Sequence, residues 1–295
     1  MTPTITTLQL AANGLRFSAR AAGQGPLVLC LHGFPDSAHG FDALLLTLAG
    51  AGYRAVAPFM RGYAPTTAPR KSDYGVPTLG RDVLALADAL GAQRFHVIGH
   101  DWGAIAAYAA AAYAPRRIPG MVTAAVPPLR RFLANMRARQ LRRSWYIGFF
   151  QLPWLSEHRL GGDDCALVER LWRAWSPHWE FTAADLDPVK NILSDPRSKR
   201  AALGYYRALP GLLCGPRCRR ERARMLTSRL QVPTLMIAGE SDGCIGPEMW
   251  RGTEICFTAP CNVTTMAAGH FMHRELPEPF AQAVLGHFAD HRQGG

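Results

Sequence analysis

The stretch Phe95-His-Val-Ile-Gly-His-Asp-Trp-Gly-Ala104 decides the fold, because it reads as a strand, a tight turn and a helix in direct succession. An apolar run ends at Gly99, Asp101 follows, and Gly103 opens an alanine-rich segment that is typical of a helix. The two glycines allow strand and helix backbones to approach closely around a strained turn. The turn therefore projects the Asp101 side chain at a helix N-terminus, where unpaired N–H groups favour a carboxylate.

Apolar runs and helical periodicity alternate along most of the remaining chain. The spacing predicts strands at 5–11, 15–21, 27–31, 55–59, 95–98, 120–126, 233–238 and 262–268. It predicts helices at 41–48, 79–90, 104–114, 247–252 and 277–288. Asn13-Gly14 separates the first two strands and is a hairpin signal. We therefore expect an α/β fold with a mostly parallel, doubly wound sheet that helices cover on both faces.

The middle of the chain, residues 128–229, has a different character. It is rich in aromatic residues and predicts only helices, at 132–141, 145–150, 165–175, 188–193, 198–209 and 217–230. It also holds the whole net charge of +11, with 20 Lys and Arg against 9 Asp and Glu, while the rest of the chain has 13 of each sign. We therefore expect an inserted helical domain at 128–229 between two parts of one core domain, 1–127 and 230–295.

Charge and cysteine usage limit the partners and the compartment. The basic segment fits either an anionic partner or a solvated helical face, and it lacks the interleaved aromatics of nucleic-acid-binding modules, so we expect no nucleic acid partner. No basic leader with an apolar core is present, and the longest apolar stretch, 104–114, is too short to span a bilayer. We expect a cytoplasmic protein without stable membrane insertion. Seven scattered cysteines without a CxxC pair favour reduced thiols, and we expect no metal and no cofactor.

Three candidate catalytic side chains follow predicted strands: Asp101, Asp242 and His270. Ligands gather at the carboxyl ends of strands in an open α/β sheet. Their order along the chain is that of the nucleophile, acid and histidine of a hydrolase triad. Taken alone, Asp101 could be a helix N-cap, Glu240 competes with Asp242, and His273 competes with His270. Only His270 directly follows a glycine at a strand end, which favours it over His273, and the presence of an acid and a histidine at other strand ends favours a catalytic Asp101 over a helix cap, whereas Glu240 and Asp242 both stay open.

Together with His32-Gly-Phe-Pro35, these motifs resemble the α/β-hydrolase superfamily. Within it, Gly99-His-Asp-Trp-Gly103 resembles the epoxide hydrolases and haloalkane dehalogenases, which carry aspartate in place of the nucleophilic serine. The resemblance covers nearly the whole chain and implies the α/β-hydrolase fold, with 128–229 as the family's helical cap. The spacing in this family selects Asp242 rather than Glu240 as the acid, and the resemblance also implies that the backbone amides of Phe34 and Trp102 form the oxyanion hole.

The residue types explain the expected chemistry. A carboxylate is ionised at neutral pH and can displace a leaving group at saturated carbon, which gives an ester on Asp101. Water then hydrolyses that ester, so His270 acts as the base toward water and Asp242 orients its ring.

The leaving group distinguishes the two families. Epoxide opening produces an alkoxide that needs a proton donor, and two cap segments are similar to those that supply tyrosines in epoxide hydrolases; they map to Tyr146 and Tyr206. Halide release instead needs two N–H donors. Trp102 could supply one of them. In dehalogenases the second donor is often an asparagine at the position of Phe34, so here it would have to come from a cap tryptophan.

We therefore expect a hydrolase acting on ether bonds: a cofactor-independent epoxide hydrolase that converts a small apolar epoxide and water to a vicinal diol. Haloalkane dehalogenation by the same triad is the alternative, and a non-catalytic binding scaffold is the third reading. By the resemblance, we place His32, Pro35, Trp145 and Phe150 at the substrate site. The sequence leaves a homo-oligomer open.

Overall fold

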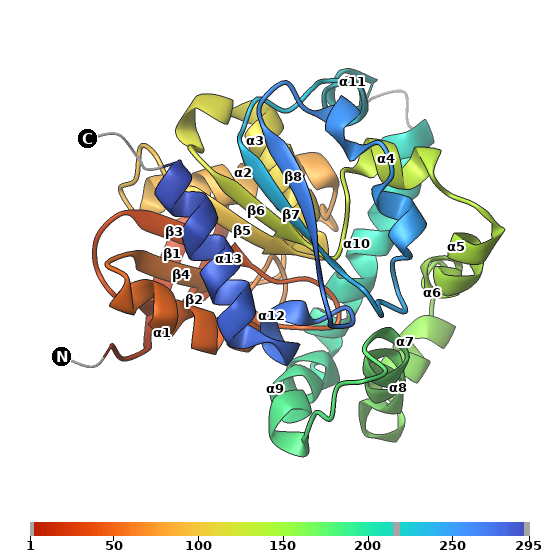
Figure 1. The fold of residues 1–295 in the computed structure, drawn as a ribbon. Helices are drawn as coiled ribbons and strands as arrows, with labels where there is room; N and C mark the ends of the chain where they lie inside the picture. Colours follow the sequence, from red (N-terminus) through yellow and green to blue (C-terminus); the bar gives the residue numbers. More distant parts are fainter. Residues whose placement is uncertain (1–2, 215–218, 292–295) are drawn as a thin grey trace.

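The computed structural model describes residues 3–214 and 219–291 (Figure 1). Its centre is an eight-stranded sheet in the order β1-β2-β4-β3-β5-β6-β7-β8. The strands are β1 (Thr6–Ala12), β2 (Leu15–Ala22), β3 (Leu27–Leu31), β4 (Arg54–Pro58), β5 (His96–His100), β6 (Met121–Ala124), β7 (Thr234–Gly239) and β8 (Cys261–Met266). The pairs β1–β2 and β2–β4 are antiparallel, and every pair from β4 to β8 is parallel. The expected mostly parallel sheet is confirmed.

Helices cover both faces of this sheet (Figure 1). The helices of the sheet domain are α1 (Asp42–Gly50), α2 (Val76–Ala89), α3 (Trp102–Tyr113), α12 (Met272–Glu275) and α13 (Pro277–Asp290). α1 packs with α13 on one face, and α2 packs with α3 on the other. Short 3-10 turns connect them: η1 (Ala38–Phe41), η2 (Pro115–Arg117), η5 (Pro247–Trp250) and η6 (Thr253–Cys256).

The three central strands β3, β5 and β6 are buried along their whole length, because helices cover both of their faces. Their register brings the strand ends level. Leu31 lies opposite Gly99, and His100 lies opposite Ala124. The loops that follow the parallel strands therefore meet at one edge of the sheet, which is where ligands bind in folds of this kind.

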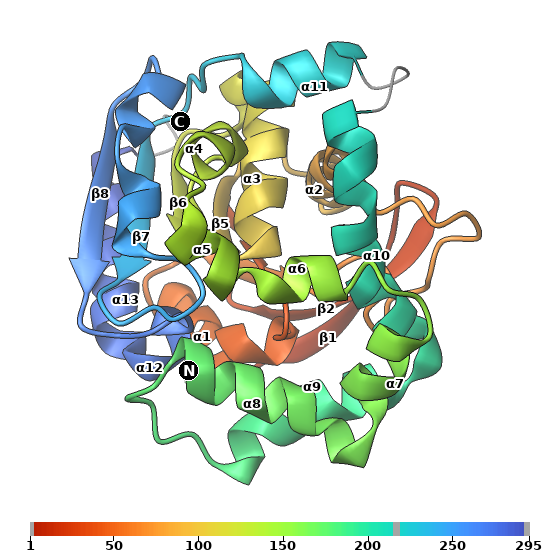
Figure 2. The ribbon, with the colours of Figure 1, turned by 90° about the vertical axis from the view of Figure 1, so that its right-hand side faces the viewer.

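Between β6 and β7 the described residues form helices and no strand. These helices are α4 (Leu129–Ala134), α5 (Ala138–Arg143), α6 (Trp145–Phe149), α7 (Leu155–Gly161), α8 (Ala166–Trp175), α9 (Ala183–Ser194), α10 (Pro196–Cys214) and α11 (Arg219–Leu226), with the 3-10 turn η3 (Asp163–Cys165). Most of them face the viewer in Figure 2, whereas α11 lies beside α3. We refer to 128–229 as the cap. Within residues 3–214 and 219–291, no helix has the length and apolarity needed to cross a bilayer.

Two segments that were expected to be helices differ from the prediction, and they contact each other where they differ. The helix expected at 132–141 is divided into α4 and α5, and the segment 247–252 forms only the turn η5. The amide side chain of Asn135, which ends α4, donates to the backbone carbonyls of Met249 and Arg251 over 3.0 and 2.9 Å. Asparagine often ends a helix in this way, because its side chain competes for backbone groups.

Other cap helices extend beyond their predicted ends. The helix expected at 188–193 begins earlier, as α9, because Thr182 and Asp185 form a capping box, and Pro188 lies inside the helix. α7 was not predicted at all. The helix expected at 217–230 starts outside the described residues, and α11 ends at Leu226.

Candidate active site

Asp101 lies in a sharp turn between β5 and α3, and its backbone is strained. Its φ of 51° and ψ of −116° lie in a region that residues other than glycine rarely adopt. Glycines make the turn possible: a Cβ on Gly33 would overlap the Asp101 carboxylate, and one on Gly103 would overlap the carbonyl of Leu31. The strained turn thus holds the Asp101 side chain beyond the end of the strand.

The Asp101 carboxylate is buried and is held from two sides. The Phe34 amide donates to Oδ1 over 2.7 Å, and Oδ2 lies 3.8 Å from Nε2 of His270. Burial raises the pKa of Asp101 to about 6, while His270 and the amides of Phe34 and Trp102 act in the opposite direction. At neutral pH the carboxyl is therefore mostly ionised but poorly solvated, which is the state that a carboxylate nucleophile needs.

His270 is fully buried, and its two ring nitrogens have different surroundings. Nδ1 lies 2.9 Å from Oδ2 of Asp242, and Nε2 has no hydrogen-bond partner among the described residues. Oδ1 of Asp242 accepts from the amides of Cys244 and Ile245 over 2.7 and 2.8 Å. Burial opposes a charge on His270, but the carboxylates of Asp242, Asp101 and Glu275 together outweigh it, and the pKa of His270 is raised. The ring is therefore oriented with its free nitrogen toward Asp101.

The residues that competed with the triad in the sequence lie elsewhere. Nε2 of His273 lies 3.1 Å from Oδ2 of Asp36, and Glu240 is exposed. His100, next to the nucleophile, lies with Nε2 2.8 Å from the backbone carbonyl of His270. His100 therefore links the strained turn to the loop that carries His270, and it does not line the cavity in front of Asp101.

A mainly apolar cavity of about 40 Å³ opens in front of Asp101. Its lining residues are Asp101, Trp102, Ile105, Val126, Leu129, Phe132, Tyr146, Ile147, Tyr206, Leu209 and Ile245. The walls come from α3 of the sheet domain and from α4, α6 and α10 of the cap. A space of this size holds a few water molecules, and its lining favours an apolar ligand.

Tyr146 and Tyr206 face this cavity from two different cap helices. Their rings meet edge to face with centroids 5.7 Å apart. The Tyr146 hydroxyl lies 3.2 Å from Sγ of Cys244, and the Tyr206 hydroxyl has no hydrogen-bond partner among the described residues. Burial raises the pKa of both tyrosines well above the usual range, so both hydroxyls keep a proton that they can donate. The neighbouring Tyr205 instead donates to the backbone carbonyl of Arg61.

The four residues expected at the substrate site are not among those that line this cavity. His32 is buried and accepts a backbone hydrogen bond, and Phe150 packs against the ring of Tyr206. The carbonyl of Pro35 accepts from an indole of the cap over 2.8 Å. Trp145 is 49% exposed on the outer side of α6. Phe150 therefore lies behind a residue of the cavity wall, His32 and Pro35 make contacts elsewhere in the protein, and Trp145 lies on the surface.

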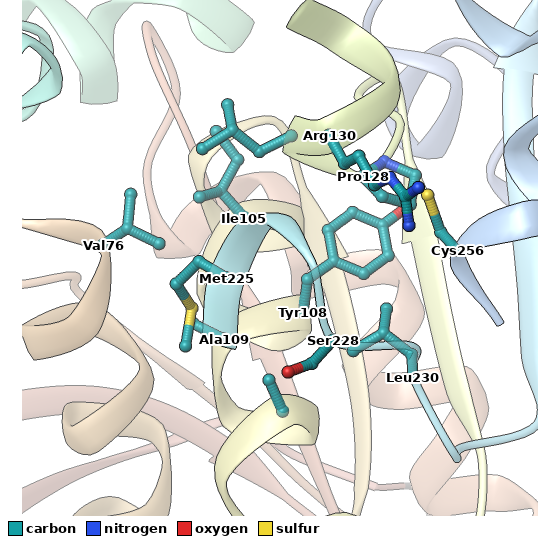
Figure 3. A pocket seen from close by; sticks show the side chains of 12 residues that line it. Val76, Ile105, Tyr108, Ala109, Pro128, Arg130, Met225, Ser228, Leu230 and Cys256 are labelled. Carbon is teal, nitrogen blue, oxygen red and sulfur yellow. The ribbon is translucent and has the colours of Figure 1, made fainter. Parts of the chain in front are cut away.

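A second, mainly apolar cavity has a volume of about 30 Å³, and its lining includes Ile105, Tyr108 and Met225 (Figure 3). Ile105 and Leu129 line both cavities. The ring of Tyr108 extends toward Arg130 and Cys256 (Figure 3). Ile105 and Leu129 therefore form the partition between the two spaces.

Among the residues that the structure describes, two buried groups have side chains of the types that bind metals. Asp36, His100 and His273 form one, and Cys244 with the triad acid and histidine forms the other. Asp36 already pairs with Arg274 over 3.1 Å, and the positive charge of Arg274 opposes a cation there. In the second group the acid and histidine already bond to each other. The Nδ1 atoms of His100 and His273 have no hydrogen-bond partner among the described residues, so in the first group it is the charge of Arg274 that weighs against a cation.

The structure adds supporting residues that the sequence did not single out. The Ser176 hydroxyl accepts from the His270 amide over 2.9 Å and donates to Glu275 over 2.6 Å. No local signal could reveal this contact, because Ser176 lies in the cap, far from His270 in sequence. Ile105 could have been found, since it is a β-branched residue one turn after Trp102 in an otherwise alanine-rich helix.

The chain is similar to known proteins over most of its length. Residues 26–273 match the family model described as alpha/beta hydrolase fold. The chain is 38% identical over 266 residues to an epoxide hydrolase of Caballeronia sordidicola, which covers 79% of this chain and 78% of that protein. It is 28% identical over 306 residues to epoxide hydrolase A of Mycobacterium tuberculosis, with 92% and 94% covered. The crystal structure of epoxide hydrolase A from Mycobacterium thermoresistibile matches with a TM-score of 0.84 at 25% identity, covering 98% of this chain and 99% of that one.

Proposed function

This chain belongs to the α/β-hydrolase family, and we propose that it is an epoxide hydrolase in which Asp101 is the nucleophile. One arrangement carries the proposal: a buried carboxylate and two protonated tyrosines line the same apolar cavity. Opening an epoxide needs both groups, because attack at carbon leaves an alkoxide that must be protonated. The epoxide hydrolases among the relatives support the same assignment.

In the first step, Oδ2 of Asp101 attacks a ring carbon of the epoxide. The ester C–O bond forms as the ring C–O bond breaks, and the electron pair of the broken bond goes to the ring oxygen. Tyr146 or Tyr206 donates its phenolic proton to this oxygen, which leaves a hydroxyalkyl ester on Asp101 and a tyrosinate. Oδ2 is the attacking atom because the Phe34 amide already occupies Oδ1.

In the second step, water attacks the ester carbonyl carbon. Nε2 of His270 takes a proton from the water, Asp242 stabilises the imidazolium, and the amides of Phe34 and Trp102 hold the oxyanion. Collapse expels the diol oxygen, which takes the proton from the imidazolium. The remaining water proton, now on the carboxyl of Asp101, returns to the tyrosinate and restores the enzyme.

Esterification also prepares His270 for its role. The negative charge of Asp101 is one of the charges that raise the pKa of His270. Forming the ester removes that charge, so the pKa of His270 falls. The histidine therefore becomes a neutral base at the stage when water must be deprotonated.

Haloalkane dehalogenation and a binding scaffold have less support. A leaving halide needs two N–H donors, and among the described lining residues of the cavity only Trp102 carries an indole N–H. The Trp172 indole donates to the Pro35 carbonyl, and Trp145 and Trp154 are exposed. The ring of Trp175 lies 4.9 Å from that of Tyr146, but neither Trp175 nor Trp179 lines the cavity. A binding scaffold gives no reason for a strained, buried Asp101 that faces a free histidine nitrogen.

A single-turnover experiment in water labelled with heavy oxygen tests the ester mechanism. With enzyme in excess over a terminal epoxide, the first diol should be unlabelled and the label should appear in the Asp101 peptide. The reason is that the diol takes its new oxygen from the carboxylate, and water replaces that oxygen on the enzyme. Label in the first diol would instead mean that water attacks the epoxide directly.

A further inference from the structure

The outer face of the cap exposes large apolar side chains that the proposed reaction does not use. Trp154 is 85% exposed, and Trp145, Leu152 and Leu155 are 49%, 49% and 46% exposed. They lie on α6, on α7 and on the connection between these two helices, which are neighbours in Figures 1 and 2. Single exposed apolar residues are common in proteins, but four large ones within 145–155 form a patch.

Trp154 is held in a strained turn. Its φ is 69° and its ψ is −51°, and the amide of Leu155 donates to the carbonyl of Pro153 over 2.8 Å. This is a γ-turn with a positive central φ, a rare and strained conformation for a residue with a large side chain. Glycine would adopt it without strain. Folding alone therefore gives no reason for a tryptophan here with its ring in solvent, and the strain points to a function in binding.

A hollow of about 330 Å³ lies between α6, α7 and α8, and it has an apolar and a basic side. Trp145 and Leu155 line the apolar side, and Arg159 and Arg170 line the basic side. Asp163 is the carboxylate that faces this hollow. Both arginines are exposed, and no ion pair involves either of them in the part of the chain that the structure describes.

A second hollow, of about 420 Å³, is lined by Trp154, Glu157 and Arg200. The acidic residue there, Glu157, pairs with Arg207 over 2.6 Å, so its charge is already neutralised. The arginines around the patch therefore outweigh its carboxylates, in keeping with the net positive charge of 128–229.

We propose that this cap patch, made of Trp145, Leu152, Trp154, Leu155, Arg159 and Arg170, adsorbs reversibly to the surface of a bilayer that contains anionic phospholipids. Tryptophan rings favour the boundary between lipid headgroups and acyl chains. Arginines close to that boundary are attracted by the negative surface potential of the lipid. Adsorption of this kind needs no spanning helix.

A second copy of the chain fits the patch less well. A twofold interface places the same surface on both partners, so Arg159 and Arg170 would approach their own copies. An anionic lipid surface complements the same charges. Helix α6 also carries Trp145 on its outer side and Tyr146 in the cavity wall. A docked cap would therefore hold the active-site cavity close to apolar compounds dissolved in the bilayer.

The test uses the full chain and sucrose-loaded vesicles of phosphatidylcholine, alone or mixed with phosphatidylglycerol. We expect the protein to sediment with the mixed vesicles, to bind the pure phosphatidylcholine vesicles weakly, and to dissociate as salt is added. Trp154→Gly should lower the partition coefficient about tenfold without lowering the melting temperature, because glycine relieves the turn. Arg159→Gln combined with Arg170→Gln should lower the partition coefficient by about tenfold or more.

Leu46→Ser is the matched control, because Leu46 is an exposed apolar residue, 37% accessible, on α1 of the sheet domain. This variant should bind vesicles as the wild type does. The proposal is overturned if the wild type stays in the supernatant with the mixed vesicles, or if Leu46→Ser loses as much binding as Trp154→Gly. It is also overturned if light scattering shows a dimer that Trp154→Gly converts to monomers, because the patch would then be an interface between copies.

Discussion

Nδ1 of His270 lies 2.9 Å from Oδ2 of Asp242, and this contact turns the other ring nitrogen of His270 toward Asp101. The 3.8 Å between Nε2 and the Asp101 carboxylate is too long for a hydrogen bond. The nucleophile therefore does not depend on the histidine as a base. The histidine remains free to act on water once an ester has formed, so the geometry assigns the two groups to two successive steps.

The rate of ester formation should fall as the pH drops through about 6. Burial raises the pKa of Asp101 to about 6, and only the ionised carboxylate attacks carbon. The measurement is the single-turnover rate of ester formation as a function of pH, followed by rapid mixing and acid quench. A rate that stays constant down to about pH 4, the ordinary range of a carboxyl group, would contradict the buried environment described for Asp101.

Asp101→Asn should abolish turnover and stabilise the fold at neutral pH. The folded-state pKa of Asp101 lies above its unfolded value, so this group costs stability once the pH rises above the unfolded pKa, and the cost is complete above about 6. The rise in the pKa of Asp101 from 3.8 to about 6 corresponds to at most about 3 kcal/mol in the free energy of unfolding. Urea unfolding at neutral pH should show the gain.

The same unfolding series supplies two controls. Below about pH 4 the gain from Asp101→Asn should vanish, because the carboxyl is then protonated in both states. Asp242→Asn should destabilise at neutral pH, because its carboxylate accepts from two backbone amides and from His270. Equal effects of the two substitutions would show that Asp101 is not a strained, poorly solvated group.

Tyr146→Phe and Tyr206→Phe should each slow ring opening, and the double variant should abolish it. Both hydroxyls are at the cavity wall, and general acid catalysis contributes about a hundredfold to ten-thousandfold to a rate. Tyr205→Phe is the matched control. It removes a hydroxyl that donates to the Arg61 carbonyl, so we expect a loss of stability with nearly unchanged ester formation. Near-normal turnover of the double variant would remove both tyrosines from the mechanism.

Much of this arrangement could be predicted from local sequence. The buried strands, the strained turn and the order of Asp101, Asp242 and His270 all follow from short patterns, because each depends on neighbouring residues. The cap could not be predicted to the same depth. Helix α6 has five residues, which is too short for periodicity to show which side is buried, and Trp145 lies outside while Tyr146 lies inside.

Long-range contacts explain the other omissions. The contact between Tyr146 and Cys244 joins residues 98 positions apart, and the contact between Ser176 and His270 joins residues 94 apart. Neither residue pair carries a local signal, because each contact exists only once cap and sheet domain have packed together. The same reason explains why His32, Pro35 and Phe150 were expected at the substrate site although they do not line the cavity.

Ile105→Ala should shift specificity toward bulkier epoxides. Ile105 and Leu129 form the partition between the active-site cavity and its neighbour, so shortening Ile105 joins the two spaces. We expect kcat/KM to rise for an aryl or branched epoxide relative to a small terminal one, with a loss of stability of about 2–4 kcal/mol. Leu46→Ser, far from both cavities, should leave this ratio unchanged. An unaltered ratio in Ile105→Ala would mean that the second cavity does not receive substrate.

The central claim is that Asp101 forms an ester with the epoxide, and the His270→Gln variant tests it most directly. This variant should complete the first step and stall before hydrolysis, since it lacks the base for water. Mass measurement of the peptide that contains Asp101, after incubation with an epoxide, should show an increment equal to the whole epoxide. An alkyl increment that appears only with a haloalkane, together with halide release, would contradict the account and identify a dehalogenase.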